Sequence, residues 1–79
     1  MSDHNSVTLR KNLDSVGVAS LERQLKADLA CECGPLPREV ALALLAQVRA
    51  HLAGTPGCLT IVVDAGIPVS ASLTPEEAP

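Results

Sequence analysis

The chain contains no Phe, Tyr or Trp among its 79 residues, and this absence limits its fold more than any other feature. Aromatic side chains are normally the largest groups that fill a protein core. Here the core must be built mainly from twelve Leu, eight Val and eleven Ala, and each Ala buries little area. A domain of this length already has a thin stability margin. Dimerisation, a metal ion or very regular helix packing would each compensate for the weak core.

The charge balance makes some partners unfavourable. Nine acidic and six basic side chains leave a formal net charge of −3. Non-specific nucleic-acid binding needs a basic surface, and single-stranded bases need aromatic rings on which to stack. We therefore expect no nucleic-acid partner. We also expect no membrane partner, because the longest apolar run, residues 40–46, is far shorter than the roughly 18 residues of a membrane span.

Three Cys residues and the start of the chain indicate the compartment. The first six residues are polar and lack the basic and apolar regions of a secretory leader. An odd number of Cys does not suggest a disulfide framework. These observations predict a cytoplasmic protein with reduced thiols.

The secondary structure of the N-terminal segment is left open by the sequence. Residues 1–6 are polar and we expect them to be disordered. Within residues 7–16, Leu9, Leu13 and Val16 are spaced by four and three, which is typical of a helix. The same segment begins with alternating apolar and polar residues, so it is equally compatible with a short strand.

Two helices are predicted next. The first spans residues 20–32, with Ser20 as its N-cap. Its apolar stripe is formed by Leu21, Leu25 and Leu29. The second spans residues 37–53, because Pro37 favours the first helical turn and Gly54 suits the position after the last. The short turn between them predicts an αα-hairpin.

The second predicted helix is apolar on all sides over residues 40–46. Such a helix is normally buried on more than one side. It lies either between a helix and a sheet or lends its second face to another copy of the chain. Leu44 and Leu45 point about 100° apart, so we assign Leu44 to the core. The predicted interface with a second copy or a partner is then Ala41, Leu45 and Leu52.

The last third of the chain predicts an antiparallel β-hairpin. Residues 58–63 are apolar and β-branched, and residues 64–66 can form a three-residue loop with Gly66 in the left-handed conformation. Residues 67–73 alternate, with one predicted buried face: Ile67, Val69, Ala71 and Leu73. Pro68 places this strand at a sheet edge, because proline cannot donate a ladder hydrogen bond.

The elements together predict a single small α+β domain over residues 7–73, an αα-hairpin followed by a β-hairpin. Residues 74–79 are acidic and flanked by proline, and we expect a flexible tail.

Four side chains are the residue types of a structural zinc site: Cys31, Cys33, His51 and Cys58. Their spacing departs from the paired ligands of known zinc modules. The small core would benefit from zinc, but the sequence predicts neither a metal nor another cofactor. A Cys–His pair could also suggest nucleophilic catalysis, yet no orienting Asn or Asp is placed by pattern. We therefore expect no enzyme activity.

Two alternative functions remain, a small helix-turn-helix transcriptional regulator and a zinc-stabilised structural module. The first is suggested because two helices follow one another across a turn that contains glycine. A DNA-reading helix needs polar side chains near its N-terminus, and the second predicted helix has few.

The favoured hypothesis is a non-enzymatic protein-interaction module. The excess of apolar residues over what a small core can bury predicts a homodimer, a bound partner protein or both. In size and composition the chain resembles many phage-encoded accessory inhibitors, anti-CRISPR proteins among them. That resemblance implies a protein that binds and modulates or inhibits a partner.

Overall fold

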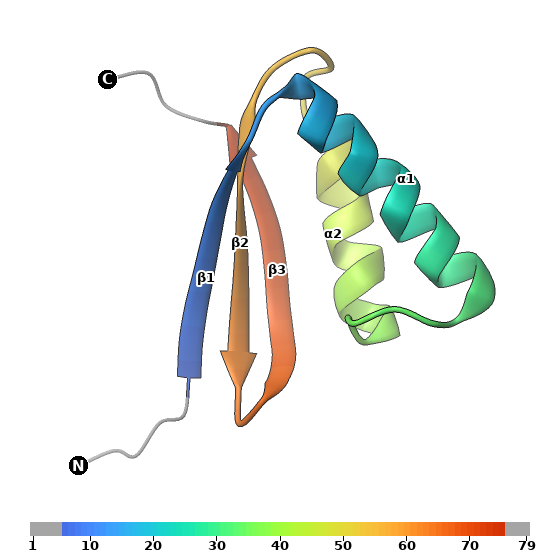
Figure 1. Ribbon diagram of the computed structural model, residues 1–79, viewed down its shortest axis with the longest axis vertical. Coiled ribbons are helices and arrows are strands. Elements are labelled where there is room, and N and C mark those ends of the chain that lie inside the picture. Colours follow the sequence, from blue (N-terminus) through green and yellow to red (C-terminus); the bar gives the residue numbers. More distant parts are fainter. Residues whose placement is uncertain (1–5, 76–79) are drawn as a thin grey trace.

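The computed structural model describes residues 6–75 as an α+β domain, as the sequence predicts. The order is β1 (Ser6–Leu13), α1 (Ser15–Cys31), α2 (Arg38–Ala50), β2 (Gly57–Asp64) and β3 (Ile67–Pro75). Figure 1 shows a three-stranded sheet with the helical hairpin to one side of it. The N-terminal segment is therefore a strand, which resolves the alternative that the sequence left open.

The sheet is antiparallel, with β2 between β1 and β3. Leu9 of β1 lies opposite Ile61 of β2, which lies opposite Ala71 of β3. The edge position predicted for the strand containing Pro68 is confirmed, since β3 has a neighbour on one side only. β1 forms the other edge, so each edge strand lies beside the same central strand.

Helix α1 begins earlier than predicted because Asp14, not Ser20, is its N-cap. The Asp14 carboxylate accepts a 2.7 Å hydrogen bond from the Gly17 backbone N–H. The helix therefore passes through Gly17 and Ser20 without a break. Val18 after the cap belongs to the core cluster and Leu13 before the cap packs against that cluster, as in a hydrophobic staple. One residue thus separates the end of β1 from the start of α1.

Helix α2 ends at Ala50, three residues before the predicted end. His51 is the C-cap and has an extended backbone. Its Nε2 lies 3.0 Å from Thr55 Oγ1 and 3.1 Å from the Thr55 carbonyl oxygen. These contacts hold the turn that leads into β2, so Gly54 belongs to this turn and does not directly follow the helix.

The β2–β3 hairpin has a two-residue turn, one residue shorter than predicted. Ala65 and Gly66 connect the strands, and both have positive φ angles, of 54° and 81°. Two such residues are typical of the tight hairpin turns that match strand twist. A register shift opposite Val62 and Val63 then interrupts the predicted alternation of β3. Ala71 and Leu73 are buried as predicted, whereas Ile67 and Val69 are exposed.

The strands extend beyond the predicted domain limits. Ser6 is in β1, and Thr74 and Pro75 are in β3, so these three residues are not part of a disordered end. The rest of the predicted tails, residues 1–5 and 76–79, lies outside the described part of the chain.

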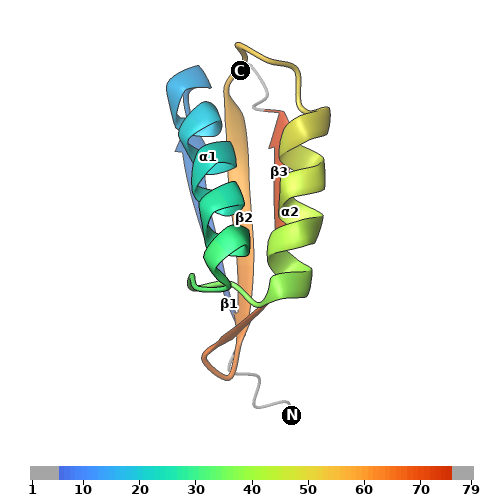
Figure 2. The same ribbon diagram turned by 90° about the vertical axis from the view of Figure 1, so that its right-hand side faces the viewer.

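The core is small and one-sided. Its buried side chains are Val18, Leu25, Ala41, Leu44, Leu45, Val48, Ala71 and Leu73. Figure 2 shows both helices in front of the sheet, and packing connects α1 to α2 and α2 to β3. The Cα radius of gyration is 13.1 Å, against about 11–12 Å for a compact domain of this length. The helices therefore cover only part of the sheet.

Candidate functional site: an uncovered apolar face of the sheet

One side of the sheet carries the apolar residues. Ile61 packs against the core, and side chains on alternate residues of a strand share a face. Val63 therefore lies on the same side as Ile61. Val7 and Leu9, opposite them on β1, lie there too. We call these four residues the apolar face.

Burial decreases across this side of the sheet from β3 to β1. In the row formed by Ala71, Ile61 and Leu9, Ala71 is 6% exposed, Ile61 is half-buried and Leu9 is 52% exposed. In the next row, Leu73 is buried, Leu59 is half-buried and Lys11 is exposed. The helix layer thus covers the β3 side and leaves the β1 side open.

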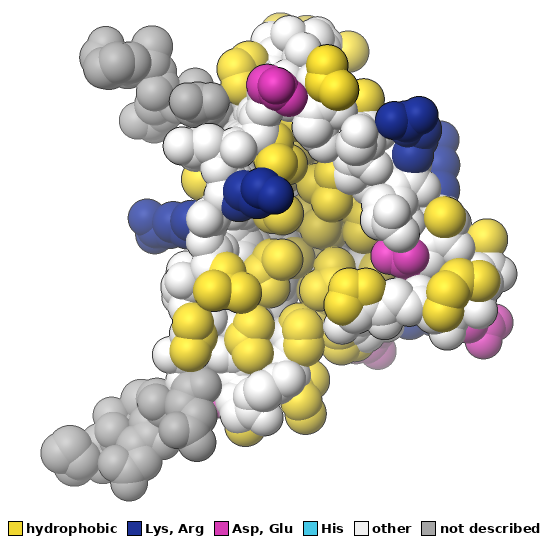
Figure 3. Space-filling model, viewed as in Figure 1, with side chains coloured by type: hydrophobic (Ala, Val, Ile, Leu, Met, Phe, Trp, Pro, Cys, Tyr) yellow, Lys and Arg dark blue, Asp and Glu magenta, His cyan; other side chains and the backbone are white. Residues whose placement is uncertain are grey.

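The surface shows the same asymmetry. In Figure 3, hydrophobic side chains continue from the lower part of the sheet into a hollow between the sheet and the helices. Figure 1 shows that α1 diverges from β1 after the turn that joins them. The half-buried apolar residues packed against the core are Leu13, Leu21, Leu29, Leu36, Val40, Leu59 and Ile61. The open side of the sheet is therefore continuous with the core.

The structure divides the predicted interface on α2. Ala41 and Leu45 are 3% and 8% exposed and belong to the core of one chain, whereas Leu52 is 72% exposed. The three residues thus do not share a surface. Leu44 is in the core, as assigned, and is completely buried. Of the two positions considered for the apolar helix, the structure shows the one between a helix and the sheet.

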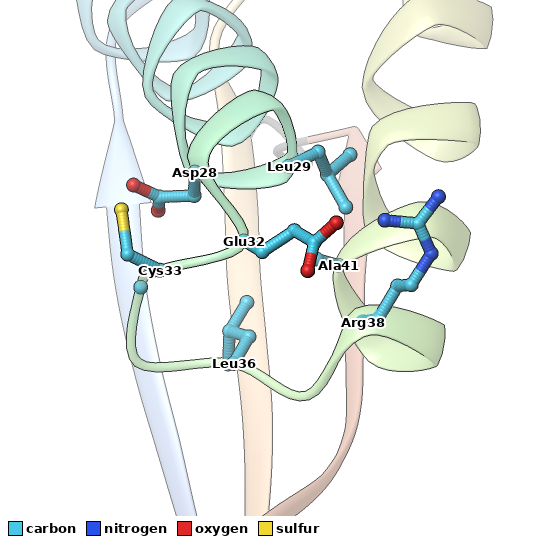
Figure 4. Close-up of a pocket in the computed structure, with 8 residues that line it drawn as sticks. Asp28, Leu29, Glu32, Cys33, Leu36, Arg38 and Ala41 are labelled. Carbon is cyan, nitrogen blue, oxygen red and sulfur yellow. The ribbon is translucent and has the colours of Figure 1, made fainter.

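A shallow pocket of about 330 Å³ lies at the turn between the helices. Figure 4 shows Glu32 and Arg38 reaching into it from the end of α1 and the start of α2. Gly34, with φ of +131°, lies so near Asp28 that a Cβ there would be 2.7 Å from the carboxyl carbon. Glycine at this position therefore lets the chain pass close beneath α1.

Cys31 and Cys33 form a disulfide in this turn, contrary to the expected reduced thiols. The sulfur of Cys33 is therefore not a free nucleophile in this structure. Cys58 is free and half-buried in β2. The pocket contains two carboxylates, those of Asp28 and Glu32, and the Arg38 guanidinium. This arrangement provides charge but no nucleophile–base pair.

The four candidate zinc ligands are not brought together. Cys31 ends α1 and Cys33 lies in the turn that leads to the N-terminal end of α2, whereas His51 caps the C-terminal end of α2. Thirteen helical residues separate these ends, which is about 20 Å. Within residues 6–75, no group of three or more His, Cys, Asp or Glu side chains is placed to hold a metal ion.

The helical surface has few groups for reading DNA bases. The exposed side of α2 consists largely of Leu42, Ala43, Ala46 and Ala50. Arg38 and Arg49 lie at opposite ends of the helix.

No helix in the described chain is long and apolar enough to cross a membrane.

No family model, no curated protein and no solved structure matches this chain. Sequence reasoning missed the apolar face because Val7 and Leu9 belonged to a segment without a secondary-structure assignment. The alternation from Val7 to Leu9 was the one available signal, and the partner residues Ile61 and Val63 lie more than fifty positions away.

Proposed function

We propose that this protein is a non-enzymatic interaction module that binds a partner protein through the apolar face. The observation that supports this proposal is the decrease in burial from β3 to β1, which leaves Val7 and Leu9 about half exposed beside the core. Contiguous apolar surface bordered by polar residues is typical of protein-binding sites. Binding itself would modulate or inhibit the partner, as in the small phage-encoded inhibitors that the chain resembles in size and composition.

The charges beside the apolar face favour a partner surface with acidic groups. Lys11 lies on the same side of the sheet as Val7 and Leu9, and Arg10, its neighbour on β1, points to the opposite side. The strand contains no acidic residue. The strand is therefore positively charged, although the chain as a whole carries a net charge of −3. Opposite charges around an apolar contact increase the rate and the specificity of association. We therefore expect the partner to carry Asp or Glu side chains around an apolar centre.

A charged substitution in the apolar face tests the proposal. Val63→Lys places a positive charge within the apolar face, and Ser70→Lys places the same charge on the exposed, opposite side of the sheet. Both variants should fold, as judged by circular dichroism. Proteins captured on the immobilised wild-type chain should be retained by Ser70→Lys, whereas their affinity for Val63→Lys should fall at least tenfold.

The same two variants can be compared without a partner. A dye that fluoresces on apolar surfaces should bind the wild type and Ser70→Lys equally, and Val63→Lys more weakly. Equal partner capture and equal dye binding by all three proteins would show that the apolar face is ordinary surface, and the proposal would be wrong.

A further inference from the structure

The outer edge of β1 is a regular strand edge that is protected only by the charges of Arg10 and Lys11. β1 pairs residue by residue with β2, from Ser6 opposite Asp64 to Leu13 opposite Gly57, without a bulge. The strand contains no proline, and residues 6–12 are exposed. Within residues 6–75, no strand pairs with its outer edge. A long strand edge of this kind is a template for pairing with another strand.

We propose that β1 pairs in antiparallel orientation with β1 of a second copy, with Leu9 of each copy opposite Leu9 of the other. The two three-stranded sheets would form one six-stranded sheet with two-fold symmetry. A strand added to a sheet edge satisfies the unpaired backbone groups along that edge. The inference rests on the proposed function, because it names a second copy as one partner of the open side of the sheet.

The side-chain alternation limits the possible registers. Residues that lie opposite in an antiparallel pair point to the same side of the sheet. A register that keeps the two apolar faces on one side must therefore be centred on a residue of β1. Centring on Arg10 would place two arginines opposite each other, and like charges in that position are destabilising.

Centring on Leu9 avoids this repulsion. It places Val7 opposite Lys11 and Thr8 opposite Arg10, so no two cations are directly opposed. The aliphatic part of Lys11 can cover Val7 while its amino group stays in water. The two cations of β1 thus disfavour registers centred on Arg10 or Lys11. Centring on Thr8 also keeps the cations apart, but it pairs only residues 6–10 of β1 with one another, whereas centring on Leu9 pairs residues 6–12.

The helices do not obstruct this pairing. Figure 1 shows the helical hairpin on the side of β3 and Figure 2 shows both helices in front of the sheet, so neither helix lies along the outer edge of β1. In the two-fold dimer, both helical hairpins would lie at the outer flanks, and the two apolar faces would join at Leu9. One strand from each copy buries less than the roughly 800 Å² per partner of a standard stable interface. We therefore expect dissociation in the micromolar range.

Solution mass tests the edge. Light scattering on the wild-type chain from micromolar to millimolar concentration should show a monomer–dimer equilibrium. Leu9→Lys should raise the dissociation constant at least tenfold. Val69→Lys is the matched control, because Leu9 and Val69 are both 52% exposed but lie on different edge strands, and it should not change the constant. A single-chain mass for the wild type over the whole range would overturn the proposal.

Cysteine cross-linking tests the register, with Cys58 replaced by Ser throughout. Leu9→Cys should form a covalent dimer on mild oxidation, because opposed residues in an antiparallel pair lie within disulfide reach. Neither Val7→Cys nor Lys11→Cys should form a disulfide-linked dimer when it is oxidised alone. A mixture of the two variants should form one. Efficient self-cross-linking of Val7→Cys, or no cross-link of Leu9→Cys, would overturn the Leu9-centred dimer. The cross-linking result does not change whether Val63→Lys loses its partner protein, so the two proposals can fail separately.

Discussion

The two edge strands of this sheet have opposite surroundings. β3 carries Pro68 and Pro75, which supply no backbone N–H, and its register shifts beside Val62 and Val63. Helix α2 packs against β3, and the Leu73 N–H donates a 3.0 Å hydrogen bond to Gln47 Oε1 of that helix. Proline, irregular pairing and a covering helix are the usual means by which proteins protect a sheet edge.

The edge formed by β1 has none of these protections. It is regular, free of proline and uncovered, and only the charges of Arg10 and Lys11 oppose pairing. The difference follows from the helix layer, whose apolar contacts with the sheet lie mainly on β3. Leu, Val and Ala side chains are short, and no aromatic ring is present to bridge the space between α1 and β1. The small core thus stabilises one edge and leaves the other available for binding.

The largest expected difference between the edges is in stability. Leu73 of β3 is buried, so Leu73→Ala should lower the free energy of unfolding by about 2–5 kcal/mol. Leu9→Ala on β1 should cost under about 1 kcal/mol, because about half of that side chain is already in water. Chemical unfolding followed by circular dichroism measures both values, at concentrations where the chain is monomeric. Equal losses would show that β1 supports the core as much as β3 does.

A smaller effect is expected from the hydrogen bond between α2 and β3. Gln47→Leu removes the acceptor of the Leu73 N–H and should cost about 0.5–1.5 kcal/mol. Hydrogen exchange of the Leu73 amide should become faster. Gln47→Glu keeps an acceptor at the same position and is the matched control. If the Leu73 amide exchanges at the same rate in Gln47→Leu and Gln47→Glu, the covering helix protects this edge without the hydrogen bond.

The smallest change in stability is expected for Pro68→Thr. The substitution restores a backbone N–H at the β3 edge and should alter the free energy of unfolding by under about 0.5 kcal/mol. Association should change more, because a second edge becomes able to pair, and light scattering should detect species larger than a dimer at high concentration. Ser70→Thr, on the same strand, should not do so. Unchanged mass for Pro68→Thr would mean that Pro68 is not needed, and that α2, Pro75 and the irregular pairing suffice to protect β3.

Local signals in the sequence predicted much of the fold. The two helices, the hairpin and the edge position of the strand with Pro68 depend on side-chain spacing and on proline geometry, which act within a few residues. Burial of Leu44 followed from the apolar stripe of the second helix. The start of α1 was missed because Asp14 and Ser20 are both good N-caps, and spacing alone does not choose between them.

The candidate site was not predicted, because its residues meet only through long-range pairing. Leu9 lies opposite Ile61, and nothing in the neighbourhood of either residue indicates the other. Leu45 was assigned to an interface because it points away from Leu44. The structure places α2 between α1 and β3, so both directions lead into the core of one chain.

The amino-acid composition alone makes the core small, since a chain without aromatic residues has no large aromatic side chain to bury. The sequence also determines where the backbone turns and which strand carries prolines, because these are properties of single residues. Which apolar residues stay exposed, in contrast, follows from how the helices and the sheet pack together. That outcome depends on where the helix layer settles on the sheet, and α2 packs on β3, where Ala71 and Leu73 meet its apolar side chains and Gln47 bonds the strand edge. β1 is left uncovered because the layer is too small to reach both edges.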